Sequence, residues 1–143
     1  MSVEPSDPTQ IRVLAVTVDD ITSAIEANIR RDAEAVLRVT PPFSGRMRAR
    51  LHRQGAEDDY EEPTPLHIPP EQFVEAIPGF PSPDETEDEL RTAPEVTYTP
   101  TRHRKRYQTA VEAWRRNLQE SIVPSVRIET PDGRHEVRVA PLG

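Results

Sequence analysis

The stretch that decides the fold is AVLRVTPPFSGRMRARLH, residues 35–52. On each side of its centre, apolar and polar residues alternate with a period of two, which is typical of strands with one buried face. The alternating positions are 37–40 and 46–52. Between them, PPFSG supplies prolines with a fixed φ and a glycine that tolerates positive φ. We therefore predict a β-hairpin over these residues.

Upstream of this hairpin, the chain begins with a polar, proline-containing tail at residues 1–10 and a short apolar run at 11–16 that is typical of a strand. Thr17 and Asp20 have the spacing of a helix capping box, so we predict a helix over about 18–32. Its apolar face is expected to comprise Ile21, Ala24, Ile25 and Ile29.

The C-terminal third repeats the order of helix then hairpin. Thr99 and Pro100 are suited to the N-cap and first position of a long helix that Pro124 ends. Its apolar stripe is Tyr107, Val111, Trp114, Leu118 and Ile122. Alternation at 126–129 and 137–139, around a Pro-Asp-Gly turn, predicts a second hairpin.

Residues 54–100 differ from the rest in being rich in proline and acidic residues. We predict an irregular arm, interrupted by short helices at about 70–77 and 83–91, the second with Ser82 as its N-cap. The whole pattern predicts one α+β domain over residues 11–143, with this arm inserted between its halves. Its core is expected to be a mostly antiparallel sheet of two hairpins, plus a possible short N-terminal strand, packed against two helices.

Composition excludes several classes of protein. The formal charge of −7 argues against coating nucleic acid or an anionic membrane by bulk charge, although a local basic patch stays possible. The chain has no cysteine, so disulfides, thiol nucleophiles and thiolate metal sites are excluded. No signal peptide or apolar run of ~18 residues is evident, and we expect a soluble cytoplasmic protein without membrane contact.

The stretch at 35–52, together with TYTPTRHRKRYQTAVEAW at 97–114, resembles small uncharacterised proteins of haloarchaea. The resemblance covers most of the chain and implies a halophilic protein of one domain, with no established activity. Seventeen of the 18 basic residues are arginine, and acidic residues outnumber them. Salt adaptation, GC-rich coding and function each explain this bias.

Arginines on the predicted strands are the first candidate site. Arg46, Arg48 and Arg50 share one face of a strand, and Arg38 lies on its partner. If the second hairpin joins the same sheet, Arg127 and Arg138 extend this face. Guanidinium groups bind phosphate and carboxylate in bidentate fashion, so nucleic acid or an acidic protein is a suitable partner. The alternative is an ordinary solvated face.

A second basic cluster lies in the first turns of the long helix, where the helix dipole disfavours cations. Its candidate anion-binding residues are Arg102, Arg104, Lys105 and Arg106. The alternative is that the acidic run at 84–89 folds back and neutralises it.

Three hypotheses of function follow. The first is a binding module for an anionic partner. The second is a protein-interaction or assembly subunit that docks through residues 54–100, with Phe73, Ile77 and Phe80 as anchors. The third is an enzyme whose residues converge only in the fold. We find no catalytic motif, no metal-ligand spacing and no cofactor signature, and we favour a non-enzymatic role.

Overall fold

The computed structural model describes residues 7–53 and 64–143, so a prediction that concerns residues 54–63 lies outside the described part. These residues form three α-helices, α1 (Val18–Arg31), α2 (Pro83–Thr92) and α3 (Pro100–Glu120), with the 3₁₀ turns η1 (Pro8–Gln10) and η2 (Pro70–Phe73). The strands are β1 (Val13–Thr17), β2 (Ala35–Val39), β3 (Arg46–Arg48), β4 (Arg50–Arg53), β5 (Leu66–Ile68), β6 (Ser125–Thr130) and β7 (Gly133–Leu142).

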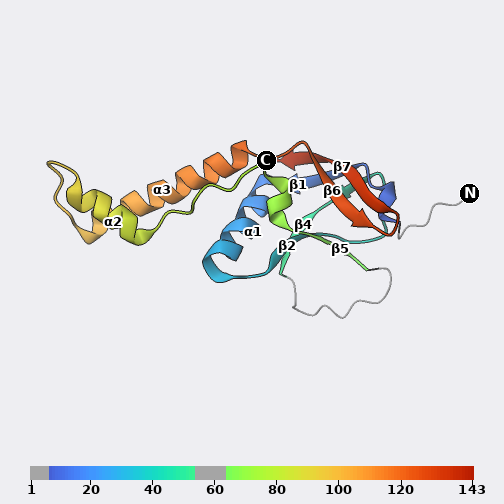
Figure 1. Ribbon diagram of the computed structural model, residues 1–143, viewed down its shortest axis with the longest axis horizontal. Helices are drawn as coiled ribbons and strands as arrows, with labels where there is room; N and C mark the ends of the chain where they lie inside the picture. Colours follow the sequence, from blue (N-terminus) through green and yellow to red (C-terminus); the bar gives the residue numbers. More distant parts are fainter. Residues whose placement is uncertain (1–6, 54–63) are drawn as a thin grey trace, which may run out of the picture.

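The strands make two sheets (Figure 1). A four-stranded mixed sheet has the order β3-β1-β7-β6, and a three-stranded antiparallel sheet has the order β4-β2-β5. β1 runs parallel to both of its neighbours, whereas β6 and β7 form an antiparallel hairpin. The predicted α+β class is confirmed.

The single predicted sheet is divided because the strand predicted at 46–52 bends at Ala49. This residue is fully buried, and its N–H donates to the Ala15 carbonyl at 2.9 Å. Before the bend, β3 pairs with β1; after it, β4 pairs with β2, with Leu51 opposite Leu37. The predicted hairpin therefore exists only in its β2–β4 half, and one continuous stretch joins the two sheets.

The core lies between the inner faces of the two sheets and α1. It includes Leu14, Val16, Val137 and Val139 from the larger sheet and Leu37, Val39 and Ile68 from the smaller one. Because the sheets supply each other's apolar surface, α3 does not need to cover them along its length. This is the physical reason why the predicted arrangement of one sheet beneath two helices is not found.

α1 has the boundaries that its local sequence predicts. The Thr17 hydroxyl accepts a hydrogen bond from the Asp20 N–H at 3.0 Å, which caps the helix. Ile21, Ala24 and Ile25 are buried, but Ile29 is 45% exposed and does not belong to the buried face.

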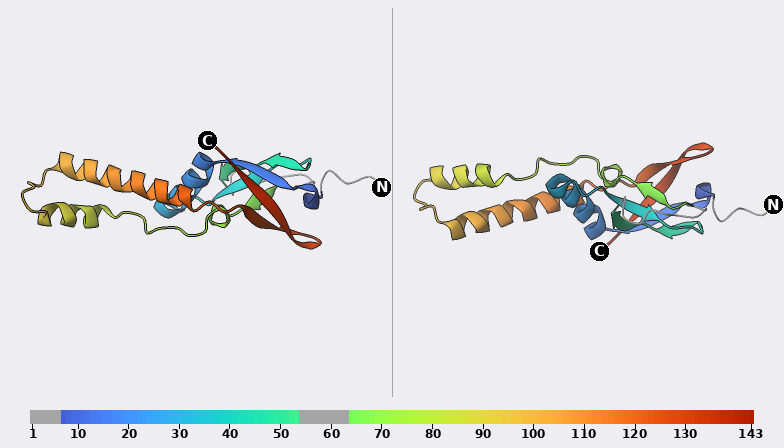
Figure 2. Two further views of the ribbon diagram at one scale, coloured as in Figure 1. Left: turned by 90° about the horizontal axis from the view of Figure 1, so that it is seen from above. Right: turned by 90° about the horizontal axis from the view of Figure 1, so that it is seen from below.

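α2 and α3 form a helical hairpin that projects from the sheets (Figures 1 and 2). Ser82 and Thr99 cap the two helices through their hydroxyl groups, at positions that the sequence predicts. The described part of the predicted irregular arm is thus more regular than expected, since it contains β5, η2 and α2. The helix predicted at 70–77 is reduced to the four residues of η2.

Contacts of α3 join the hairpin to the rest of the molecule, including burial of Leu118 in the core. The Trp114 indole N–H donates to the Pro78 carbonyl at 2.8 Å, and Phe80 packs edge-on against the same ring. On another side, Arg115 donates to both carboxylate oxygens of Glu26 on α1, at 2.7 and 3.0 Å. Arg30 donates to the same carboxylate at 3.2 Å.

None of the helices in the described ranges combines the length and the apolar composition that a bilayer span requires.

Replacing Glu26 with Gln is expected to lower the free energy of unfolding by about 2 kcal/mol at pH 7, because two arginines lose a charged acceptor. Hydrogen bonds from Arg115 hold the pKa of this carboxyl below its ordinary value of 4.5. A depressed folded-state pKa gives stability that is present above the unfolded pKa and is lost as pH falls through the folded one. The stability difference between wild type and E26Q should therefore shrink below about pH 4.5.

Chemical unfolding monitored by circular dichroism across pH 3–8 measures this difference. E120Q is the matched control, since Glu120 is exposed and makes no ion pair within the described part of the chain. A pH-independent difference between wild type and E26Q would contradict the assignment.

Candidate anion-binding site

Arginines gather on the outer face of the four-stranded sheet. Residues opposite each other on adjacent strands project to the same side of a sheet. Val13 of β1 lies opposite Arg46 of β3 on one side and Arg138 of β7 on the other. The two arginines are therefore two strand spacings apart, about 10 Å between Cα atoms, with Val13 between them.

The next outward-facing residue of β1 has a similar arrangement of cross-strand neighbours. Ala15 lies opposite Arg48 of β3 and Ala140 of β7. Ala15 is only 7% exposed although it is on the outer face, so neighbouring side chains cover it. We name the three residues Arg46, Arg48 and Arg138, which surround the small residues Val13 and Ala15, the arginine face.

The arginine face has no internal charge compensation. Across residues 7–53 and 64–143, none of its three side chains makes an ion pair or a hydrogen bond. The Nε atom of Arg48 is buried without a hydrogen-bond partner in those ranges. A buried donor without an acceptor costs about 1–3 kcal/mol.

Charge is balanced, in contrast, on the β6 side of the same sheet. Arg134 donates to Glu129 at 3.3 Å, and Arg127 lies directly opposite Glu136. Positive charge is therefore concentrated at β3, β1 and the neighbouring part of β7.

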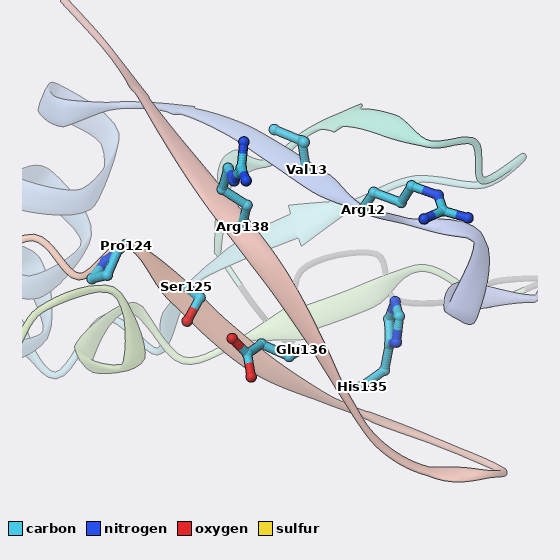
Figure 3. A pocket seen from close by; sticks show the side chains of 7 residues that line it. All are labelled: Arg12, Val13, Pro124, Ser125, His135, Glu136 and Arg138. Carbon is cyan, nitrogen blue, oxygen red and sulfur yellow. The ribbon is translucent and has the colours of Figure 1, made fainter.

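A hollow of about 740 Å³ lies beside Arg138 on this face (Figure 3). Arg138 lies beside Val13, Glu136 is near Ser125, and Arg12 and His135 are at the far end. The His135 ring N–H donates to the Ile11 carbonyl at 2.6 Å, so this nitrogen does not activate Ser125. The hollow thus brings two cations, Arg12 and Arg138, together with one carboxylate, Glu136.

The predicted strand arginines divide between two surfaces. Arg46 and Arg48 share a sheet with Arg138 and Arg127, as proposed for a common face, but Arg38 and Arg50 lie opposite each other in the smaller sheet. The bend at Ala49 causes this separation. Arg12 is not among the predicted binding residues, because it immediately precedes a strand and belongs to no basic run. Its carbonyl accepts a hydrogen bond from the Arg138 N–H, which places it beside the arginine face.

The basic cluster at the start of α3 is only partly compensated. Arg106 and Glu89 of α2 are 4.0 Å apart, and Arg102 donates to the Thr97 carbonyl at 2.7 Å. Arg104 instead lines a hollow of about 490 Å³ beside Arg30 and Arg115. Lys105 is exposed. The acidic helix does fold back on α3, but within the described residues its ion pairs reach only Arg106 of the cluster.

The three predicted docking residues have different environments. Phe73 is fully buried in the core, so it is not available as a docking anchor. Phe80 is partly buried against Trp114, with ring centroids 4.9 Å apart. Ile77 alone of the three is substantially exposed, at 41%.

No group of three or more His, Asp or Glu side chains is arranged to hold a metal ion in the described ranges. The His52 and His67 rings do approach each other, with centroids 5.3 Å apart on the smaller sheet.

Comparison with known proteins gives one match. The model of a family described as "Domain of unknown function (DUF8009)" matches residues 1–143, the whole chain. No curated protein and no solved structure is significantly similar to it.

The triple variant R46Q/R48Q/R138Q is expected to be as stable as wild type or slightly more stable. Removing three unpaired like charges relieves repulsion, and glutamine retains part of the aliphatic stem over Val13 and Ala15. Thermal unfolding should show a midpoint equal to or a few degrees above that of wild type. A fall of more than about 1 kcal/mol would mean that these arginines support the fold instead.

Proposed function

Because the chain belongs to the DUF8009 family, whose function is unknown, we propose from its own geometry that it is a non-enzymatic binding module for an anionic partner. The ligand groups are phosphates of a nucleic acid, and the arginine face binds them. The observation that carries the proposal is the set of three arginines in register, uncompensated within the described residues.

Guanidinium chemistry supports phosphate as the ligand. Each arginine presents a planar fork that donates two parallel hydrogen bonds to an anion, and it keeps its charge at all relevant pH values. Two forks that flank a small residue can contact one phosphate or two successive phosphates. Val13 and Ala15 provide a floor that leaves room for a backbone to approach.

The composition of the arginine face favours contacts with the nucleic-acid backbone over reading of bases. The residues directly opposite its arginines on adjacent strands are Val13, Ala15 and Ser125. None of them is an aromatic ring on which a base could stack. We therefore expect little sequence preference and a preference for duplexes, whose phosphates are regularly spaced. The formal net charge of −7 confines binding to this local patch.

Assembly through the helical hairpin is the second candidate function. It is favoured by the projection of α2 and α3 from the sheets and by the exposure of Ile77 and Val96, each 41% exposed. In this case partner binding would be insensitive to salt and to the arginine face.

Binding to a fluorescent 20-bp duplex, titrated across a range of KCl concentrations, tests the first candidate. Wild type should bind with an affinity that falls as salt rises, because displaced counterions accompany each phosphate contact. R46Q/R48Q/R138Q should bind at least about tenfold more weakly, with a log–log salt slope smaller by up to about 2.7.

R31Q/R53Q/R116Q is the matched control, since it removes the same charge from three exposed arginines away from the arginine face. If polyglutamate displaced the duplex and bound more tightly than the duplex does, the result would indicate an acidic protein as the partner. Equal weakening by the two triple variants would refute a local site, because bulk charge would then explain the binding.

A further inference from the structure

The two sheets are joined at one side and open at the other. They meet at the bend between β3 and β4, so the strands follow one another in the order β6-β7-β1-β3, then β4-β2-β5. At the opposite side, β6 is the last strand of the larger sheet and β5 the last strand of the smaller one. Neither has a second paired strand among the described residues.

A groove lies between these two edges. One hollow, of about 110 Å³, is lined by Leu66, Ile68, Arg127 and Ile128, together with Gln72 and Glu129. A second, of about 360 Å³, continues along β6 and shares Gln72, Arg127 and Glu129 with the first. The groove therefore follows the edge of β6 and reaches β5.

The backbone of β6 directs hydrogen-bonding groups into this groove. The Val139 N–H donates to the Pro124 carbonyl at 2.8 Å, which shows that the backbone of residue 124 faces β7. Backbone direction alternates along a strand of an antiparallel pair, so residues 126 and 128 also face β7. The N–H and C=O groups of Ser125, Arg127 and Glu129 therefore point to the open edge, where no strand of the described chain pairs with them.

We propose that this groove binds an extended segment of a partner protein, which adds to the edge of β6 as a further strand. The segment alternates apolar and acidic residues. The inward side chains of the two edges are Ile128 and Ile68, only 3% and 4% exposed, so apolar residues fit on that side. Along the second hollow the outward side chains include two arginines, Arg127 and Arg134, and one carboxylate, Glu129, so acidic residues suit the outward side.

The occupant is a single strand because the groove is bounded on both sides. A second copy of this chain would bring its whole sheet to β6, where β5 and Gln72 of η2 already line the other side of the first hollow. A two-fold pairing of β6 about Arg127 would also place like charges opposite each other. The proposal is independent of the arginine face, since neither hollow is lined by Arg46, Arg48 or Arg138.

The probe is a fluorescent ten-residue peptide of alternating Val and Asp, compared with one of alternating Val and Lys by anisotropy. E129P removes one outward-facing N–H and leaves the β6–β7 hydrogen bonds intact, as proline at a sheet edge can do. Its matched control E129A loses the same carboxylate but keeps the N–H. R127E keeps the backbone and reverses the charge beside the groove.

Wild type should bind the Val/Asp peptide at least about tenfold more tightly than the Val/Lys peptide. E129A should bind it within about twofold of wild type, whereas E129P should lose about tenfold, the effect of losing one interstrand hydrogen bond in a desolvated site. R127E should reverse the preference between the two peptides. Hydrogen exchange at the Arg127 and Glu129 amides should slow when the Val/Asp peptide binds, which tests the groove without any substitution.

Three results would overturn the proposal. One is no binding of the Val/Asp peptide at millimolar concentration. Another is unchanged exchange at both amides in the bound state. The third is concentration-dependent self-association that E129P abolishes and E129A does not, because the groove would then serve a second copy of this chain.

Discussion

The bend at Ala49 is the constraint on which the rest of the structure depends. A straight strand over residues 46–53 would belong to one sheet and present its arginines on one face. Because Ala49 is buried and bonded to Ala15, the same stretch serves both sheets in turn. The bend thereby closes one side of the core, separates Arg46 and Arg48 from Arg50, and leaves β5 and β6 as open edges on the other side.

Buried and exposed charged side chains differ in how their charge is compensated. Where a charged group is buried, at Glu26, two arginines surround it and connect α1 to α3. On the outer face of the larger sheet, Arg46, Arg48 and Arg138 have no such compensation within the described chain. A folded chain that retains like charges close together gives up stability there, and a ligand of opposite charge recovers it.

Local features were predictable from the sequence, and pairing between distant segments was not. The caps at Thr17, Ser82 and Thr99 depend on residues within one turn, so their positions were predicted correctly. The alternation that predicts a strand is the same whether the chain bends at Ala49 or continues straight, so the second sheet was missed. Burial of Phe73 depends likewise on the tertiary fold, since its local sequence is equally suited to an exposed anchor.

Trp114, the only tryptophan of the chain, lies where the helical hairpin joins the body. It is 3% exposed, is hydrogen-bonded to Pro78 and contacts Phe80, so we expect the indole emission of a ring shielded from water. Detachment of the segment around residues 78–80 from α3 would hydrate the ring and shift this emission to the red. The protein therefore contains an intrinsic optical reporter of the attachment of its own hairpin, which requires no dye and no engineered residue.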